Sequence, residues 1–251
     1  MMACSRKNDT PPNPRGKLAA RGPWAIIRPM PWARKRHAAM KPKLQYRPGA
    51  AIAHLRAGDP ALAALIDRAG PFALELRPSA SLFEALLRAI VYQQLHAKAA
   101  STILGRVLAE LERHGGPTAE ALAKVGDTAL RGAGLSGNKQ RAVRDLAAKC
   151  LDGTVPSLRE ARELEDDELV ERLTAVRGIG PWTVHMLLIF TLGRPDVMPT
   201  GDFAIRLGFK KLYRKRKDPS PEAIVAHARR WRPYRSVASW YLWRSLDDEV
   251  S

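Results

Sequence analysis

The sequence contains only two cysteines, Cys4 and Cys150, among 251 residues. Two thiols this far apart exclude a disulfide framework, a zinc site built on cysteines and a four-cysteine iron–sulfur cluster. Long apolar runs are also lacking, because the stretch 186–190 is soon broken by Gly193 and Arg194, well short of the roughly 20 residues that cross a bilayer. We therefore expect a soluble protein in a reducing compartment, stabilised by its core rather than by cross-links.

Acidic residues are scarce. There are 25 Asp and Glu against 42 Lys and Arg, a formal net charge of +17, and a protein this basic binds polyanions, nucleic acid above all. Residues 1–47 contribute +11 of this charge, with Asp9 as their one acidic residue. The segment's prolines and its lack of helical periodicity predict a disordered basic tail. An organelle transit peptide and an over-extended start, with Met30 or Met40 as the true first residue, are the alternatives.

Patterns typical of strands are rare beyond this segment, and helical patterns run through residues 48–251, which we interpret as one domain. Ser81 and Glu84 form a capping box before an apolar face at helical spacing. Asp166 can cap a second helix, and Ser220 followed by proline begins another. The sequence therefore predicts an all-α fold.

The stretch VRGIGPWTV at residues 176–184 predicts a tight turn between two helices. Gly178 and Gly180 permit positive φ and a close backbone approach, and Pro181 suits a first helical turn because its missing N–H costs nothing there. Such a helix–hairpin–helix exposes backbone N–H groups that stabilise a phosphate oxygen. An ordinary αα-hairpin used only for packing is the alternative.

The stretch MPTGDFAIRLG at residues 198–208 places Asp202 at a helix start, where an aspartate is usually a cap. Together with the hairpin, with LLRAIVYQQLHAKAASTI at 86–103 and with WRPYRSVASWYLW at 231–243, it resembles the helix–hairpin–helix DNA glycosylases. The branch it is most similar to is that of 3-methyladenine DNA glycosylase II, which acts on alkylated purines. The resemblance implies two closely packed helical subdomains with the active site in the cleft between them. It also implies a monomer that binds double-stranded DNA.

The resemblance also implies roles in the reaction. Asp202 would be the catalytic carboxylate that stabilises a sugar with oxocarbenium character or activates the attacking water. Trp182 and Trp243 would line the base pocket and attract a cationic base, with Met186 where some relatives carry another aromatic ring. Alternatively, Trp182 packs the hairpin against the core, and Trp243 belongs to the core of its own helix.

Further positions match residues that contact DNA in the family. Gln94, with Gln93 beside it, would fill the gap left by the extruded base; the alternative is two polar residues at a helix end. The other group would bind backbone phosphates, and its members are Gly178, Gly180, Thr183 and Lys139.

Two absences distinguish the sequence from other branches of the family. Bifunctional members carry a Schiff-base lysine two residues after the second hairpin glycine, where this sequence has Trp182, and iron–sulfur members carry cysteines after the catalytic helices, where none follows Cys150. We therefore expect a monofunctional enzyme that uses neither a cofactor nor a catalytic metal. The sequence does not decide whether the hairpin binds a structural monovalent cation. We expect it in the cytoplasm, associated with the nucleoid if bacterial, and leave organelle targeting open. A glycosylase for another damaged base and a non-catalytic DNA-binding module are the rival functions.

Overall fold

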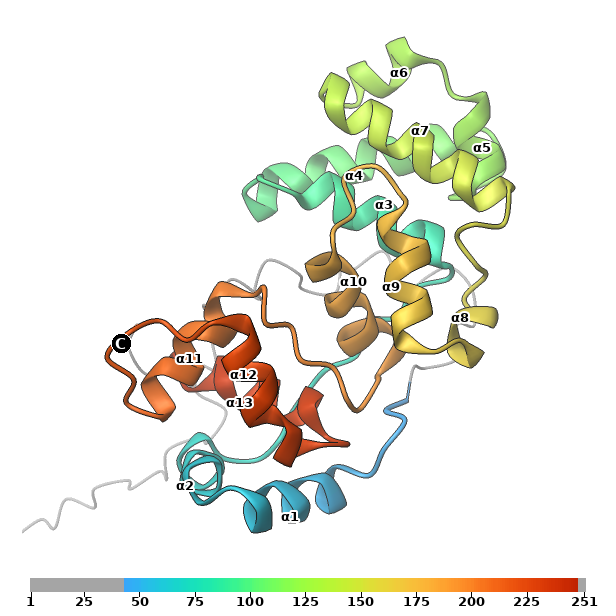
Figure 1. Ribbon diagram of the computed structural model, residues 1–251. Coiled ribbons are helices and arrows are strands. Elements are labelled where there is room, and N and C mark those ends of the chain that lie inside the picture. Colours follow the sequence, from blue (N-terminus) through green and yellow to red (C-terminus); the bar gives the residue numbers. More distant parts are fainter. Residues whose placement is uncertain (1–42, 248–251) are drawn as a thin grey trace, which may run out of the picture.

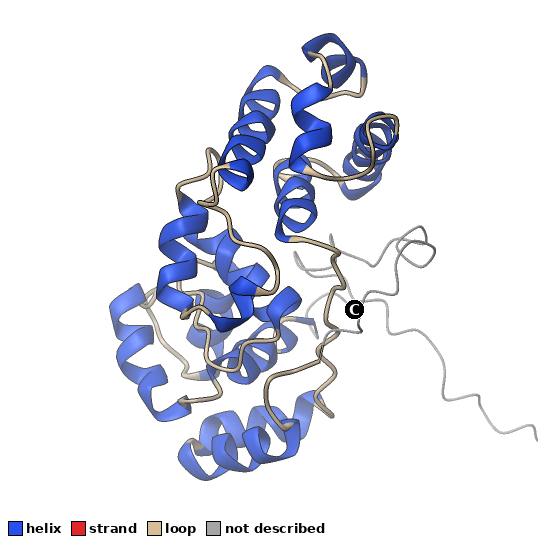
Figure 2. Ribbon diagram, turned by 90° about the vertical axis from the view of Figure 1, so that its right-hand side faces the viewer, coloured by secondary structure: helices blue, strands red, loops and turns tan. Residues whose placement is uncertain are grey.

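The computed structural model describes residues 43–247, and every regular element in that range is a helix (Figure 1; Figure 2). The all-α prediction is confirmed, whereas the predicted basic tail lies almost wholly outside the described residues. No helix within the described range is long and apolar enough to cross a membrane. The helices are α1 (Pro48–Gly58), α2 (Pro60–Ala69), α3 (Leu82–Tyr92), α4 (Ala97–Glu112), α5 (Ala119–Lys124), α6 (Asp127–Gly132), α7 (Gly137–Leu151), α8 (Glu160–Glu163), α9 (Asp166–Thr174), α10 (Pro181–Leu187), α11 (Phe203–Leu212), α12 (Pro221–Ala228) and α13 (Arg235–Arg244), with a π-helix η3 (Leu188–Leu192) and a 3-10 turn η4 (Arg229–Trp231).

The helices form two packed groups (Figure 1). Helices α1 and α2 pack against α11, α13 and the turn η4, and α12 packs against α11 and η4, so the two ends of the described chain share one group. Helices α3 to α10 form the other group, and the chain passes between the groups along residues 70–81 and 193–202. The buried apolar side chains nevertheless form one continuous cluster. This arrangement agrees with the predicted pair of closely packed subdomains.

Two predicted helix starts are present with small differences in detail. The Ser81 hydroxyl accepts from the Glu84 amide at 3.1 Å, but the Glu84 carboxylate accepts from the amide of Ala80 rather than of Ser81. At α12 the Ser220 hydroxyl accepts from the Ala223 amide at 3.2 Å, with proline at the first helical position. Both starts follow from local hydrogen bonding, which explains why sequence alone predicts them.

The predicted cap at Asp166 is wrong. The residue is the first of α9 rather than its N-cap, which is Glu165 and makes no side-chain cap. The Asp166 carboxylate instead lies 3.1 Å from the guanidinium of Arg194. The Asp166 side chain therefore makes a tertiary ion pair instead of a helix cap.

A buried carboxylate, Asp59, ties the two ends of the described chain together. It is 2% exposed and caps α2, and its Oδ2 accepts from the Tyr213 hydroxyl at 2.5 Å, from Trp231 Nε1 at 3.0 Å and lies 3.0 Å from His227 Nε2. Burial acts to raise the pKa of Asp59, but these hydrogen bonds outweigh it and lower the pKa. Helices α11 and α12 and the turn η4 are thereby fixed to α2.

Gly208 allows α11 to lie directly against α13. A β-carbon at this position would stand 2.5 Å from the carbonyl oxygen of Leu242, a distance that real side chains do not adopt. The contact matters because α11 begins next to Asp202 and α13 carries Trp243. A side chain at Gly208 would push these two residues apart.

Gly208→Ala should therefore destabilise the protein. We expect the free energy of unfolding to fall by about 1–3 kcal/mol because the added methyl group meets backbone that must shift. Gly105→Ala in α4 is the matched control, since a β-carbon there has open space and alanine is the better helix former. Urea unfolding of both variants measures the difference, and a Gly208→Ala protein as stable as the Gly105→Ala protein would contradict the packing described.

Candidate active site

The loop before α11 sets the position of Asp202. Arg235, the first residue of α13, binds both carboxylate oxygens of Asp196, at 2.7 and 2.9 Å. The amide of Val197 donates to the Ser236 hydroxyl at 3.0 Å. Two consecutive loop residues are therefore fixed to the first turn of α13, and the loop ends at Asp202, the N-cap of α11.

The Asp202 carboxylate accepts hydrogen bonds from three donors. Its Oδ1 accepts from the Ile205 amide at 2.8 Å and from Trp243 Nε1 at 3.1 Å. Its Oδ2 accepts from Trp182 Nε1 at 2.6 Å. N–H donors and the positive end of a helix dipole stabilise a carboxylate's negative charge. The predicted cap is present, and the same carboxylate joins a tryptophan of each helical group.

Trp243 is buried in the core next to Asp202. Its side chain is 4% exposed, and its ring stacks on Phe190 with centroids 5.6 Å apart and planes inclined by 27°. The resemblance placed Trp243 in the wall of the base pocket, with the core of its own helix as the alternative; Trp243 is not among the side chains that line the cavity between α3 and α10, and its burial agrees with the alternative. The reason is that α13 packs in the core, so that its indole N–H contacts Asp202 while its ring faces apolar neighbours.

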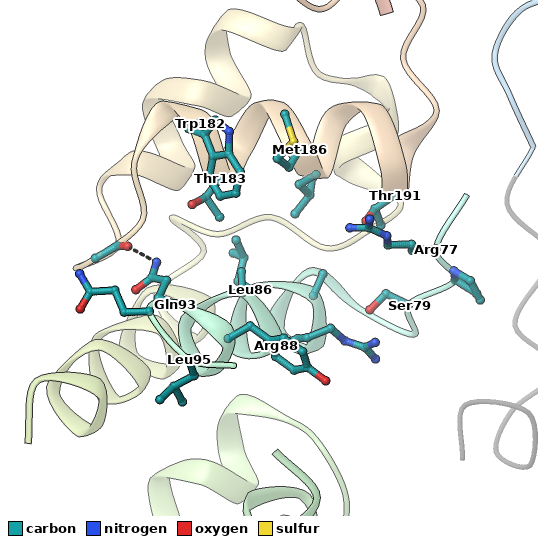
Figure 3. A pocket seen from close by; sticks show the side chains of 17 residues that line it. Arg77, Ser79, Leu86, Arg88, Gln93, Leu95, Trp182, Thr183, Met186 and Thr191 are labelled. Atoms are coloured by element: carbon teal, nitrogen blue, oxygen red, sulfur yellow. Dashed lines mark hydrogen bonds between the residues drawn. The ribbon is translucent and has the colours of Figure 1, made fainter. Parts of the chain in front are cut away.

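A cavity of about 540 Å³ opens between α3 and α10, beside Trp182 (Figure 3). Helix α10 contributes Trp182, Thr183 and Met186 to its wall, and α3 contributes Leu86 opposite them. Sites of this volume with mainly apolar walls hold small molecules. Trp182 is 45% exposed, and its bond to Asp202 places the carboxylate at the edge of the ring that lines the cavity.

The two glutamines at the end of α3 occupy different positions. Gln93 Nε2 donates to the carbonyl oxygen of Gly178 at 2.7 Å, the dashed line in Figure 3. Gln94 is exposed and has a φ of +56°, a left-handed conformation that is uncommon for residues other than glycine. The sequence grouped both as residues that fill the base stack. The structure fixes Gln93 to the hairpin and leaves Gln94 as the exposed side chain.

The hairpin between α9 and α10 exposes backbone amides. Gly178 has a φ of +79°, whereas Gly180 has a φ of −106°, so the expectation of positive φ is met at Gly178 only. The amides of Gly178, Gly180 and Trp182 donate to no other described residue. The Thr183 amide donates to the Gly180 carbonyl at 2.9 Å, and its side chain lines the cavity. The amides open to an anion are therefore the first three.

One face of α7 packs against both the hairpin and the end of α3. Lys139, Ala142 and Asp145 follow one another at intervals of three, which places them on the same side of a helix. Asp145 accepts from the Arg177 amide at 2.6 Å, and the Ala142 methyl group stands 3.7 Å from the place of a β-carbon on Gly178. Helix α7 thus fixes the hairpin and α3 relative to each other.

Lys139 supports the backbone beneath the two glutamines. Its ammonium donates to the carbonyl oxygens of Val91 at 2.6 Å and of Gln93 at 2.9 Å, at the C-terminal end of α3, where helices leave carbonyls unpaired and favour positive charge. Burial lowers the pKa of Lys139. The resemblance assigned Lys139 to a DNA phosphate; in the structure two of its three N–H donors are directed at these carbonyls.

Arg77 and Phe190 belong to the site although no sequence pattern indicated them. Arg77 lies in the irregular segment between α2 and α3 and lines the cavity at the end away from Gln93 (Figure 3). Its amide donates to the carbonyl of Phe190 at 2.6 Å, and Phe190 lies in the π-helix η3. Irregular segments and π-helices have no apolar periodicity, so only the folded chain brings these residues together.

Lys139→Met should destabilise the fold, because it keeps the length of the side chain and removes both hydrogen bonds to α3. We expect the free energy of unfolding to fall by about 1–3 kcal/mol, as two partly buried carbonyls lose a charged donor. Lys98→Met replaces an exposed lysine of α4 and should change it by less than about 0.5 kcal/mol. Urea unfolding compares the two variants; equal stabilities would show that Lys139 does not support α3.

Comparison with known proteins agrees with this geometry. The family model described as HhH-GPD superfamily base excision DNA repair protein matches residues 87–233. The DNA-3-methyladenine glycosylase 1 of Schizosaccharomyces pombe is 39% identical over 174 residues, which cover 67% of this chain and 76% of that protein.

Two solved structures share the fold over most of their length. The 3-methyladenine DNA glycosylase of Schizosaccharomyces pombe in complex with abasic DNA is 37% identical, covers 78% of this chain and 95% of its own, and has a TM-score of 0.64. The DNA-3-methyladenine glycosidase from Bacillus halodurans is 35% identical, covers 80% of this chain and 91% of its own, and has a TM-score of 0.72. The chain belongs to the HhH-GPD superfamily of base excision DNA repair proteins, as its hairpin and Asp202 predicted.

Proposed function

We propose that this protein is a monofunctional DNA glycosylase that removes alkylated purines from duplex DNA and leaves an abasic site. The observation that supports this most is the Asp202 carboxylate, which is fixed by Trp243 and by Trp182, the indole that lines a cavity large enough for a nucleobase. The names of the relatives, which are 3-methyladenine DNA glycosylases, agree with it. DNA binding alone requires neither the carboxylate nor the cavity.

The proposed reaction is hydrolysis of the bond between C1′ of the sugar and the purine nitrogen. As this bond breaks, its electron pair goes to the base, which leaves as a neutral molecule if it was alkylated and cationic. The sugar gains oxocarbenium character, and the Asp202 carboxylate stabilises that charge. The oxygen of a water molecule then bonds to C1′, and its proton passes by way of Asp202 to solvent.

Trp182 has two functions in this proposal. Its indole N–H fixes Asp202, and its half-exposed ring offers a π face to a base in the cavity. A cationic purine over such a ring gains about 0.5–2 kcal/mol, which favours alkylated bases over normal ones. A base bound on Trp182 has its glycosidic bond near the carboxylate, so that recognition and chemistry occur at adjacent atoms.

DNA would approach at the hairpin and the end of α3. The exposed amides of Gly178, Gly180 and Trp182 suit a backbone phosphate oxygen near the lesion. Extruding a base leaves a gap in the stack, and Gln94 is the exposed side chain placed to enter it. Lys139 donates to the carbonyl oxygen of Gln93. This hydrogen bond fixes the backbone next to Gln94 and supports the left-handed conformation of Gln94. The net charge of +17 favours association with the duplex.

The absence of a lyase step is part of the proposal. Cleavage of the strand through a Schiff base needs an amine that reaches C1′, and Trp182 stands where bifunctional relatives carry lysine. None of the described residues that line the cavity is a lysine. Within residues 43–247 no group of three or more His, Cys, Asp or Glu side chains is placed to bind a metal ion. A monovalent cation at the hairpin, if bound, would be structural, and the reaction proposed does not use it.

Asp202→Asn should abolish base release while preserving DNA binding. Asparagine is also a good helix N-cap, so α11 should begin normally, but the charge that stabilises the oxocarbenium-like sugar is gone. We expect release of 3-methyladenine and 7-methylguanine from alkylated duplex DNA to fall by about 10²- to 10³-fold or more.

The control for this substitution is Asp67→Asn, which removes an exposed carboxylate of α2 and should release bases at the native rate. Abasic sites scored in parallel verify the product. If the native protein binds duplex DNA but releases neither base, the proposal for alkylated purines is wrong, and a panel of deaminated and oxidised bases then distinguishes another glycosylase from a DNA-binding module.

Trp243→Phe should slow base release without changing the cavity wall. Phenylalanine can keep the stacking on Phe190, but it removes one of three donors to Asp202. A hydrogen bond to a charged group contributes about 1.5–3 kcal/mol, so we expect release to fall by about tenfold to a hundredfold. Trp240→Phe on the same helix, where no hydrogen bond is lost, should stay within about twofold. A Trp243→Phe protein with native single-turnover rates would contradict the role given to this indole.

A further inference from the structure

Arg77 is placed unusually for a charged residue. Its guanidinium lies over the ring of Phe190, 4.4 Å from the centroid, and it lines the cavity at the end away from the Gln93–Gly178 hydrogen bond (Figure 3). Its backbone amide is fixed to the Phe190 carbonyl at 2.6 Å. Phe190 stacks in turn on Trp243, which donates to Asp202. Contacts through Phe190 and Trp243 therefore connect the Arg77 guanidinium with the Asp202 carboxylate.

No carboxylate among residues 43–247 pairs with the Arg77 guanidinium. A second arginine of the cavity wall, Arg88, lies 3.7 Å from the Glu84 carboxylate. Burial, with a smaller contribution from Arg88, lowers the pKa of Arg77 to about 9, so the group still carries its charge at neutral pH. A partly buried cation without a partner is costly and favours any ligand that brings an acceptor.

We propose that Arg77 determines specificity by donating a hydrogen bond to an oxygen at C6 of the extruded purine. This inference rests on the proposed function and concerns the ranking of substrates within it: the enzyme releases both kinds of alkylated purine, and Arg77 favours those with an oxygen at C6. Purines with a C6 oxygen, such as methylated guanines and hypoxanthine, place an acceptor against the guanidinium. Purines with a C6 amine place a donor against donors and leave both groups unpaired. A site that bonds one such group rejects the analogue that lacks it far more strongly than an apolar wall does.

The direction of electron flow strengthens this preference. When the glycosidic bond breaks, its electron pair enters the purine ring, and part of this density reaches an oxygen at C6. A fixed cation at that oxygen is favourable in the transition state, and its repulsion of a positively charged base is relieved as the base becomes neutral. The charge of Arg77 acts against a methylated adenine in the ground state with no acceptor to offset it. Trp182 favours cationic bases of both kinds, so Arg77 supplies the discrimination.

Alkylated duplex DNA provides matched substrates for the test. It contains 7-methylguanine with 7-methyladenine and 3-methylguanine with 3-methyladenine, pairs that carry the methyl group at the same ring position and differ in the groups at C6 and C2. Mass spectrometry of the released bases gives the guanine-to-adenine ratio of release rates within each pair. Because both bases of a pair come from one sample, the ratio does not depend on how much of a variant is folded.

Arg77→Met should lower this ratio by about tenfold to a hundredfold in both pairs, and hypoxanthine release should fall with the guanines. Arg113→Met removes the same charge from an exposed arginine at the end of α4, outside the cavity, and should leave the ratio within about twofold. Arg77→Lys keeps a donor and should give an intermediate ratio.

An unchanged ratio in Arg77→Met, even with slower release of all bases, would overturn the inference and give Arg77 a packing role over Phe190. A native protein that releases none of these bases would refute the proposed function, and the inference would fall with it. The native protein therefore tests the function, and the ratio in the variants tests the inference.

Discussion

The structure of the site depends on one carboxylate that accepts N–H groups from two helical groups. Trp182 reaches Asp202 from α10, and Trp243 reaches it from α13, while the carboxylate also caps α11. Each indole N–H would otherwise need another acceptor, and the carboxylate would otherwise need water. Because charge-assisted hydrogen bonds are directional, the three donors fix the orientation of the carboxylate before any substrate binds. Preorganisation of this kind is what electrostatic stabilisation of a transition state requires.

Other contacts fix the elements within each of the two helical groups around this carboxylate. In one group, Asp59 binds the C-terminal helices to α2, and Gly208 lets α11 approach α13 closely. In the other, α7 holds the hairpin and the end of α3 together through Asp145 and Lys139. Cavity, hairpin and carboxylate therefore belong to one packed unit. Substitutions some distance from Asp202 should act on the site through these contacts.

Sequence alone predicts those parts of the molecule that local chemistry determines. The capping hydroxyls of Ser81 and Ser220, the helix start after Gly180 and the cap at Asp202 all depend on neighbours within a few residues, and each is present. The placement of long side chains depends on the tertiary fold and was not predictable. Lys139 binds carbonyls 46 and 48 residues away. For Trp243 the sequence left two placements open, and only the packing of α13 decides that its ring is buried. No sequence pattern indicated Arg77 as a site residue, because the ring that it contacts, Phe190, lies in a π-helix distant in sequence.

The indole N–H resonances of Trp182 and Trp243 test the central contact most directly. In a ¹⁵N–¹H correlation spectrum, with each indole assigned by a single Trp→Phe variant, Asp202→Asn should shift both resonances markedly. The resonance of Trp231, which donates to Asp59 instead, should stay in place and serves as the internal reference. Indole resonances of Trp182 and Trp243 that do not respond to Asp202→Asn would contradict the account, because the carboxylate would not then join the two helical groups.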